Sequence, residues 1–292
     1  MKIAVTGASG FLGSRVCTYY RKLGKFVVTE YTRSELDFTK QEECKIRLCE
    51  DRPDILIHTA AISDIGECEQ DPKISGKVNV EGTKNLAQIC GKLGIRMIFC
   101  SSDQVYMGNG IEVPHREEGE KLSPPTLYGQ QKLRAEEEVF CYQPDAVVLR
   151  LSWMFAKDFR EGKEHGNLIS AILGGIKNQQ KMQYPTYDFR SITDVWEVIA
   201  NLEKIFDAPA GIYNFGSENM KSTYEVVKIL AENMKAGQEL LEKNTHAFCK
   251  RPRNLMMNIE KVKKQGVTFR TTEEAMEQEG KKIRNDILSK ES

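Results

Sequence analysis

The stretch KIAVTGASGFLG at residues 2–13 decides the fold. A β-branched apolar run leads into Gly7, Gly10 and Gly13, spaced G-x-x-G-x-x-G, and a helix is predicted to begin at about Phe11. In a dinucleotide-binding turn the first glycine permits a tight turn, the second lets a pyrophosphate approach, and the third lets helix and strand pack closely. The helix N terminus then faces the phosphates with free N–H groups and its positive dipole end. The alternative is a glycine-rich turn without a ligand. We expect a nucleotide site, and its other members in this stretch are Ser9, Phe11 and Leu12.

Four more apolar runs predict strands of the same sheet, at residues 25–31, 53–61, 96–102 and 146–153. Segments of helical spacing lie between them. Near-continuous apolar strands that alternate with helices indicate a parallel sheet covered on both faces. We therefore predict an α/β fold, with a doubly wound parallel Rossmann sheet that binds NAD(P) over residues 1–150.

The pattern changes past Trp153 to mostly helix with one clear strand, GIYNFG, and two helix starts marked by capping boxes, Ser222 with Glu225 and Thr271 with Glu274. This pattern predicts a smaller C-terminal lobe over residues 151–292. The strand near residues 211–216 could rejoin the first sheet.

Composition excludes several classes of protein. The 292 residues carry 42 Lys plus Arg and 42 Asp plus Glu, so the chain lacks the basic excess typical of proteins that bind nucleic acid or anionic membranes. The eight cysteines show neither a C-x-x-C pair nor a histidine at metal-ligand spacing, so we expect reduced thiols and no metal site. No signal peptide and no apolar run of membrane-spanning length is visible. We expect a cytoplasmic protein.

The end of the second strand bears on cofactor choice, because an acidic residue there selects NAD and a basic one accommodates the 2′-phosphate of NADP. Arg33 follows the neutral Thr32, which favours NADP, with NAD as the alternative. Arg33 could equally be a solvated surface charge. Glu30 is a rival acid, but it lies inside the strand, where its side chain should face a helix layer or another side chain.

A third signal is YGQQK, in which Tyr128 and Lys132 share one helix face. A neighbouring cation favours phenolate, so we expect Lys132 to lower the pKa of Tyr128. Ser102 emerges at the carboxyl end of the fourth predicted strand, where open α/β sheets place their ligands, and its hydroxyl could polarise a substrate carbonyl. Each signal alone is weak, but together they favour catalysis.

The combination of the glycine turn, the serine and Y-x-x-x-K resembles the extended short-chain dehydrogenase/reductases. The ordered set RSELDFT, HTAA, NVEGTKNLA, SSDQVYMG, YGQQKLRAEE, LRLSWMF, YPT and RPRN is similar to the dTDP-4-dehydrorhamnose reductase family of sugar-nucleotide reductases. The resemblance implies hydride transfer from a nicotinamide to a keto-sugar, with Ser102, Tyr128 and Lys132 as the catalytic residues and Tyr128 as the proton donor. Lys132 would also hold the nicotinamide ribose. The resemblance further implies that residues 151–292 mainly bind the substrate, a nucleotide sugar. It also implies sugar contacts from Asp103 and Trp153 and a cofactor border of Asp37, Phe38, Ala60, Ala61 and Ile62.

Other substrate contacts are less specific. Gln104 stands where the family often has Tyr, which changes the substrate wall, and Arg190, Arg251 and Arg253 could grip a diphosphate or be surface charges. Trp153 could offer an apolar face to a sugar ring or be a core residue. Arg15 occupies a place where some members carry an acidic residue linked to a metal-bridged dimer, which argues against that assembly. A homodimer of another kind is compatible with the sequence.

The most specific function that the sequence supports is NAD(P)H-dependent reduction of a nucleotide-linked 4-keto-sugar, with dTDP-4-dehydro-L-rhamnose as the leading substrate. The alternatives are a sugar-nucleotide epimerase or dehydratase, which recycles its cofactor, and a non-catalytic NADP-binding regulatory subunit. Asp103 has no second acid beside it, which favours a reductase over a dehydratase.

Overall fold

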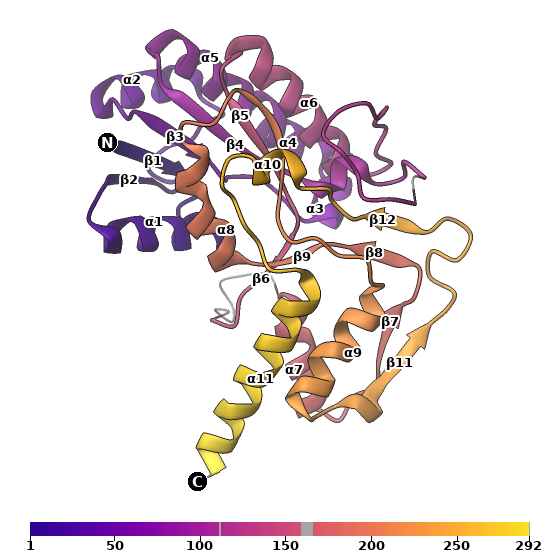
Figure 1. Ribbon diagram of the computed structural model, residues 1–292. Coiled ribbons are helices and arrows are strands. Elements are labelled where there is room, and N and C mark those ends of the chain that lie inside the picture. Colours follow the sequence, from indigo (N-terminus) through magenta and orange to yellow (C-terminus); the bar gives the residue numbers. More distant parts are fainter. Residues whose placement is uncertain (111, 159–165, 292) are drawn as a thin grey trace.

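The computed structural model describes residues 1–110, 112–158 and 166–291 (Figure 1). The first half contains β1 (Lys2–Thr6), α1 (Phe11–Leu23), β2 (Val27–Tyr31), α2 (Gln41–Asp51), β3 (Ile55–His58), α3 (Ile65–Gln70), α4 (Pro72–Gly76), the π-helical segment η1 (Lys77–Gly82), α5 (Thr83–Leu93), β4 (Arg96–Ser102), the 3-10 turn η2 (Asp103–Tyr106), α6 (Leu127–Tyr142) and β5 (Val147–Leu151).

The second half contains β6 (Trp153–Phe155), α7 (Leu168–Lys177), β7 (Met182–Pro185), β8 (Asp188–Arg190), β9 (Ile192–Asp194), α8 (Val195–Leu202), η3 (Glu203–Ile205), β10 (Gly211–Phe215), α9 (Thr223–Met234), η4 (Gln238–Leu240), β11 (Leu241–Asn244), β12 (Arg253–Leu255), α10 (Glu260–Lys263) and α11 (Thr272–Glu291).

A six-stranded sheet in the order β10-β5-β4-β3-β1-β2 forms the centre of the molecule, and all of its pairs are parallel. The five strands predicted in the first half are confirmed as β1 to β5. β1 pairs with β2 on one side and β3 on the other, so the connections reverse direction at the carboxyl end of β1. Open α/β sheets bind ligands at such a point.

Helices cover both faces of this sheet, as the near-continuous apolar strands predict (Figure 1). On one face, Val16 and Tyr20 of α1 and Val198 of α8 pack in one apolar cluster. On the other face, α2, α5 and α6 contribute Leu48, Leu86 and Val139 to a second cluster. The doubly wound fold is therefore confirmed.

β10 pairs with β5 from Gly211 beside Val147 to Phe215 beside Leu151, so the chain returns to the first sheet after leaving it. A division of the chain near residue 150 stays a prediction, and it would have to assign residues 211–215 to the first part.

The one clear strand predicted past Trp153 is confirmed as β10. The described residues of this half also hold six shorter strands that the sequence did not predict, and they form three parallel pairs, β6 with β9, β7 with β11 and β8 with β12. Such short strands show no alternation long enough to recognise in the sequence. Both capping boxes form: Ser222 Oγ accepts from the Glu225 amide at 3.3 Å, and Thr271 Oγ1 accepts from the Glu274 amide at 3.2 Å.

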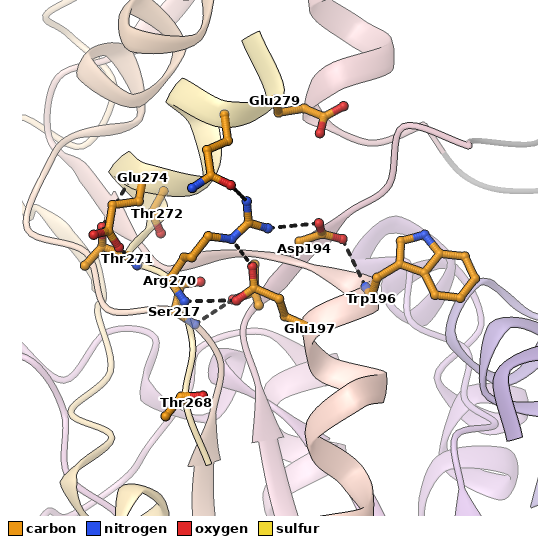
Figure 2. A network of polar contacts seen from close by, with 12 residues as sticks. Asp194, Trp196, Glu197, Ser217, Thr268, Arg270, Thr271, Thr272, Glu274 and Glu279 are labelled. Carbon is orange, nitrogen blue, oxygen red and sulfur yellow. Dashed lines mark hydrogen bonds and ion pairs between the residues drawn. The ribbon is translucent and has the colours of Figure 1, made fainter. Parts of the chain in front are cut away.

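A polar cluster around Arg270 ties α8 to the start of α11 (Figure 2). The backbone N–H of Arg270 donates to Glu197 at 2.9 Å, its guanidinium also contacts Glu197, and its Nη2 lies 3.1 Å from Asp194. A third apolar cluster, with Ile172 of α7, Leu230 of α9 and Met276 of α11, lies beneath α11. These contacts hold the start of α11 against α8 and pack α7, α9 and α11 together.

Candidate active site

The glycine turn lies at the carboxyl end of β1, and its backbone leaves no room for side chains. Gly7 has a φ of 68°, and a Cβ on it would lie 2.9 Å from the Ala60 backbone. A Cβ on Gly13 would lie 2.2 Å from the Gly7 carbonyl oxygen. α1 begins at Phe11, as predicted, and in the described part of the chain no side chain caps it and its first turn holds no acidic residue. The turn therefore fits a pyrophosphate, which needs a close backbone approach and an open helix N terminus.

The segment that follows β3 forms the opposite wall of this turn. Ala60, Ala61 and Ile62 are half-buried there. The Ile62 amide donates to Asn79 Oδ1 at 2.9 Å, and Asn79 Nδ2 donates to Gln131 Oε1 at 2.8 Å. Gln131 lies on α6 beside Lys132. The Asn79 side chain therefore joins the predicted cofactor border to the predicted catalytic helix. The sequence patterns did not point to this residue.

At the end of β2, Arg33 is exposed, and Glu30 forms an ion pair with Arg21 at 2.5 Å, as expected for an acid inside the strand. Asp37 accepts from the Thr39 hydroxyl at 2.7 Å, and this hydrogen bond lowers the Asp37 pKa. Phe38 is buried, with its ring 5.2 Å from His58 in an edge contact. Two residues predicted to lie at the cofactor site are thus core side chains. They are Phe38 and, in α1, Leu12.

Ser102, Tyr128 and Lys132 all lie buried at the carboxyl end of β4. Thr126 caps α6 by accepting from the Gly129 amide, so Tyr128 stands in the first turn of that helix. A Cβ on Gly129 would lie 2.8 Å from the Gln104 carbonyl oxygen. A glycine at this position therefore allows α6 to begin directly against η2, which brings the tyrosine to the serine.

The electrostatics of this group differ from the expectation. Burial raises the pKa of Tyr128, and the nearby Ser102 hydroxyl offsets only part of this shift. Lys132 donates to the Cys100 carbonyl at 2.8 Å, its Nζ lies 5.9 Å from the centre of the Tyr128 ring, and burial lowers its pKa to about 8. The Tyr128 pKa is therefore raised and not lowered as expected, because desolvation outweighs the effect of the Lys132 ammonium, which is bonded to a carbonyl. At neutral pH Tyr128 is a phenol with a proton to give.

A second buried polar group lies next to Ser102. Asp103 Oδ2, Gln104 Oε1 and Arg190 Nε are buried without a hydrogen-bond partner among the described residues. Arg190 Nη2 lies 3.7 Å from Asp103 Oδ2. Burial raises the Asp103 pKa, and the Arg190 charge opposes this rise. Buried polar atoms without partners are costly, and a ligand with hydroxyl groups would satisfy both the two acceptors and the donor.

The predicted apolar face of Trp153 is partly occupied, because the Arg190 guanidinium lies 4.4 Å above its ring. Arg251 is exposed and donates to the Gly108 carbonyl, and none of its contacts in the described chain is with Asp103, Gln104, Trp153 or Arg190. Arg253 forms a bidentate ion pair with Asp188, with distances of 2.7 and 2.6 Å, so its guanidinium is already occupied. Of the three arginines, Arg190 alone joins the predicted substrate group.

His58 and Arg15 lie near the site but have structural partners. His58 is fully buried between Thr6 and Thr83, and burial lowers its pKa to about 3, so it is a structural histidine. Arg15 is buried and its Nε lies 3.4 Å from Asp158.

Within the described residues no cluster of His, Cys, Asp or Glu could hold a metal ion, and no helix has the length and apolar character to cross a membrane.

A doubly wound sheet with a glycine turn at its switch point and a buried Ser–Tyr–Lys set at its carboxyl edge defines a Rossmann-type short-chain dehydrogenase/reductase. The family model described as the RmlD substrate binding domain matches residues 1–284, and the chain belongs to this family of extended short-chain dehydrogenase/reductases. The prediction of an NAD(P)-dependent oxidoreductase is thereby confirmed at the level of the family.

The chain is also similar to individual proteins and to a solved structure. The chain is 34% identical over 152 residues to a dTDP-4-dehydrorhamnose reductase of Streptomyces griseus, an alignment that covers 52% of this chain and 49% of the relative. It is 26% identical over 287 residues to the methionine adenosyltransferase 2 subunit beta of Xenopus laevis, covering 91% and 83%. A crystal structure of dTDP-4-dehydrorhamnose reductase from Bacillus anthracis in complex with NADP superposes with a TM-score of 0.81 at 20% identity, covering 95% and 97%. The relatives support a sugar-nucleotide reductase as the broad class.

Proposed function

We propose that the protein reduces the keto group of a nucleotide-linked 4-keto-sugar with NADPH, and that dTDP-4-dehydro-L-rhamnose is its leading substrate. The observation that carries the proposal is the burial of Ser102, Tyr128 and Lys132 together, next to three buried polar atoms that lack partners. The Streptomyces griseus relative bears the name of this reaction, which supports the choice of substrate.

When bound, NADPH supplies a hydride to the keto carbon. Tyr128 donates its phenolic proton to the oxygen that becomes a hydroxyl, and its raised pKa keeps that proton in place at neutral pH. The Ser102 hydroxyl donates a hydrogen bond to the same oxygen and polarises the carbonyl. Because Tyr128 is protonated at neutral pH, it is already in the form that the reductive direction requires.

Lys132 would hold a ribose hydroxyl of the cofactor, and its positive charge favours transfer of the Tyr128 proton. The glycine turn with Ser9, Gly10 and the N terminus of α1 would bind the pyrophosphate. Arg33 would donate to the 2′-phosphate, because Glu30 is paired with Arg21 and so does not compete at that position. The cofactor named in the Bacillus anthracis structure agrees with this preference.

On the substrate side, Asp103, Gln104 and Arg190 would bind hydroxyl groups of the sugar. Most of residues 151–292 would serve this side, apart from β10. Gln104 is the residue whose identity should distinguish one sugar from another, because its Oε1 needs a donor that the described chain does not provide.

The test uses purified protein, a panel of dTDP- and UDP-linked 4-keto-6-deoxysugars, and NADPH or NADH. Consumption of NADPH with a reduced sugar two mass units heavier supports the proposal, and the Tyr128→Phe variant should lose that rate. A changed sugar without net loss of cofactor would instead indicate an epimerase or dehydratase. Binding of NADPH without turnover of any sugar would indicate a regulatory subunit.

A further inference from the structure

A buried ion pair lies directly behind the candidate catalytic group. Glu136 stands on α6, one turn after Lys132, and Arg150 lies in β5; both are 2% exposed. Glu136 Oε1 accepts from Arg150 Nε at 3.0 Å, and Glu136 Oε2 accepts from Arg150 Nη2 at 2.6 Å. Glu136 Oε1 also accepts from the Ser101 hydroxyl at 2.6 Å. One carboxylate thus joins the helix of Tyr128 and Lys132 to the strand end that carries Ser102.

The pair also reaches the far end of the turn that Ser102 caps. Arg150 Nη1 donates to the Tyr106 hydroxyl at 2.9 Å, and its guanidinium lies 4.9 Å from the Tyr106 ring. Tyr106 in turn donates to Asn214 Oδ1 of β10 at 2.7 Å. Tyr106 is the last residue of η2, and Ser102 is its N-cap. The ion pair therefore holds both ends of the segment that presents Ser102, Asp103 and Gln104.

We propose that Glu136 and Arg150 are positioning residues for the reduction, which fix the distance and angle between Tyr128 on α6 and Ser102 at the end of β4. This inference rests on the proposed function. Both side chains are buried, and in the described chain neither forms a hydrogen bond with Ser102, Tyr128 or Lys132. The fork of an arginine on a carboxylate fixes orientation as well as distance, whereas a buried ion pair adds little to stability relative to apolar residues of the same volume. Proton donation and carbonyl polarisation at one oxygen depend on that orientation, because small displacements in a site reduce the rate strongly.

The pair also has an electrostatic effect. The Glu136 carboxylate raises the pKa of Lys132, against the lowering by burial. Without this charge, Lys132 would lose its proton at lower pH. The titratable and charged groups that face Lys132 from the elements packed against it are Cys100 of β4, Cys68 of α3, Glu136 and Tyr128 of α6, and His58 of β3.

The main variant is the double substitution Glu136→Leu with Arg150→Met, which replaces both charges with apolar side chains and leaves neither charge buried alone. Removing one partner would leave the other charge buried and unpaired, which destabilises the fold. A single neutralising substitution would therefore report on stability and not on the positioning of Tyr128 and Ser102. In the double variant we expect kcat to fall by about tenfold or more while the KM for NADPH stays within about twofold. The alkaline fall of kcat should move to lower pH.

Arg150→Lys separates geometry from charge, because it keeps the positive charge and loses the fork. It should lower kcat and leave the alkaline limb of the pH profile in place. The control is Glu197→Leu with Arg270→Met in the cluster of Figure 2, which removes an ion pair from the attachment of α11. The control should keep kcat even where it lowers stability.

A double variant with the wild-type kcat and pH profile would overturn the inference, as would an equal loss of kcat in the control. If the wild-type protein reduces none of the sugars, the proposed function fails. Amide hydrogen exchange of residues 102–107 then tests separately whether the ion pair positions this segment. Faster exchange there in the double variant than in the control supports the positioning role, and equal exchange overturns it.

Discussion

Substituting Gly13 with alanine tests the glycine turn on which the cofactor site rests. The new Cβ would lie 2.2 Å from the Gly7 carbonyl oxygen and 2.8 Å from Thr59 Oγ1, well short of the 3.4–4 Å of an ordinary contact. The first neighbour is backbone, and the second is held by its own hydrogen bond to the Thr6 carbonyl at 2.7 Å, so neither can move aside cheaply. We expect a cost of about 3 kcal/mol, the upper end for overpacking.

The clash also displaces α1 from the turn, so the affinity for NADPH should fall by about tenfold or more, equivalent to about 1.4 kcal/mol. Urea unfolding and NADPH fluorescence titration measure the two effects. The control is Gly174→Ala in α7, where a Cβ meets nothing within 4 Å and the helix should gain about 0.5–1 kcal/mol. Equal shifts of the urea midpoint in the two variants, or an unchanged NADPH affinity in Gly13→Ala, would refute the reasoning.

Three further outcomes are expected. Arg33→Ala should raise the KM for NADPH about tenfold and leave that for NADH unchanged, since it removes one charged contact; parallel changes for both cofactors would contradict the assignment of the 2′-phosphate site. The kcat should fall as the pH rises through about 8, because Lys132 is charged below that pKa and neutral above it, and a rate that is flat to pH 10 would exclude the role of its charge. Ser222→Ala should lower the free energy of unfolding by about 1 kcal/mol in urea denaturation, because it removes the cap of α9, and kcat should be unaffected.

The sequence was sufficient for the sheet and the turn because their signals are local. Five strands, the start of α1 and both capping boxes depend on neighbouring residues, and Tyr128 and Lys132 share a helix face by spacing alone. The partners of these residues come from far along the chain. Asn79 contacts Gln131, and Arg190 reaches both Asp103 and Trp153, through elements whose docking no local pattern specifies.

Electrostatic properties were the hardest to predict. The pKa of Tyr128 depends on how completely the fold removes water from it, and that burial outweighs the lysine four residues later. Arg253 looked equivalent to Arg190 in the sequence, but Asp188 of β8 occupies its fork. The pairing of Arg253 follows from the contact of β8 with β12, two three-residue strands that leave almost no sequence pattern.

The most direct measurement follows one deuterium. The protein is mixed with dTDP-4-dehydro-L-rhamnose and NADPH that carries deuterium at the transferred position, and the sugar and the cofactor are quantified together. Net reduction by this site predicts one deuterium at C4 of the product and one oxidised cofactor per product, both lost in Tyr128→Phe. Product without consumption of cofactor, or a full rate in Tyr128→Phe, would contradict the account.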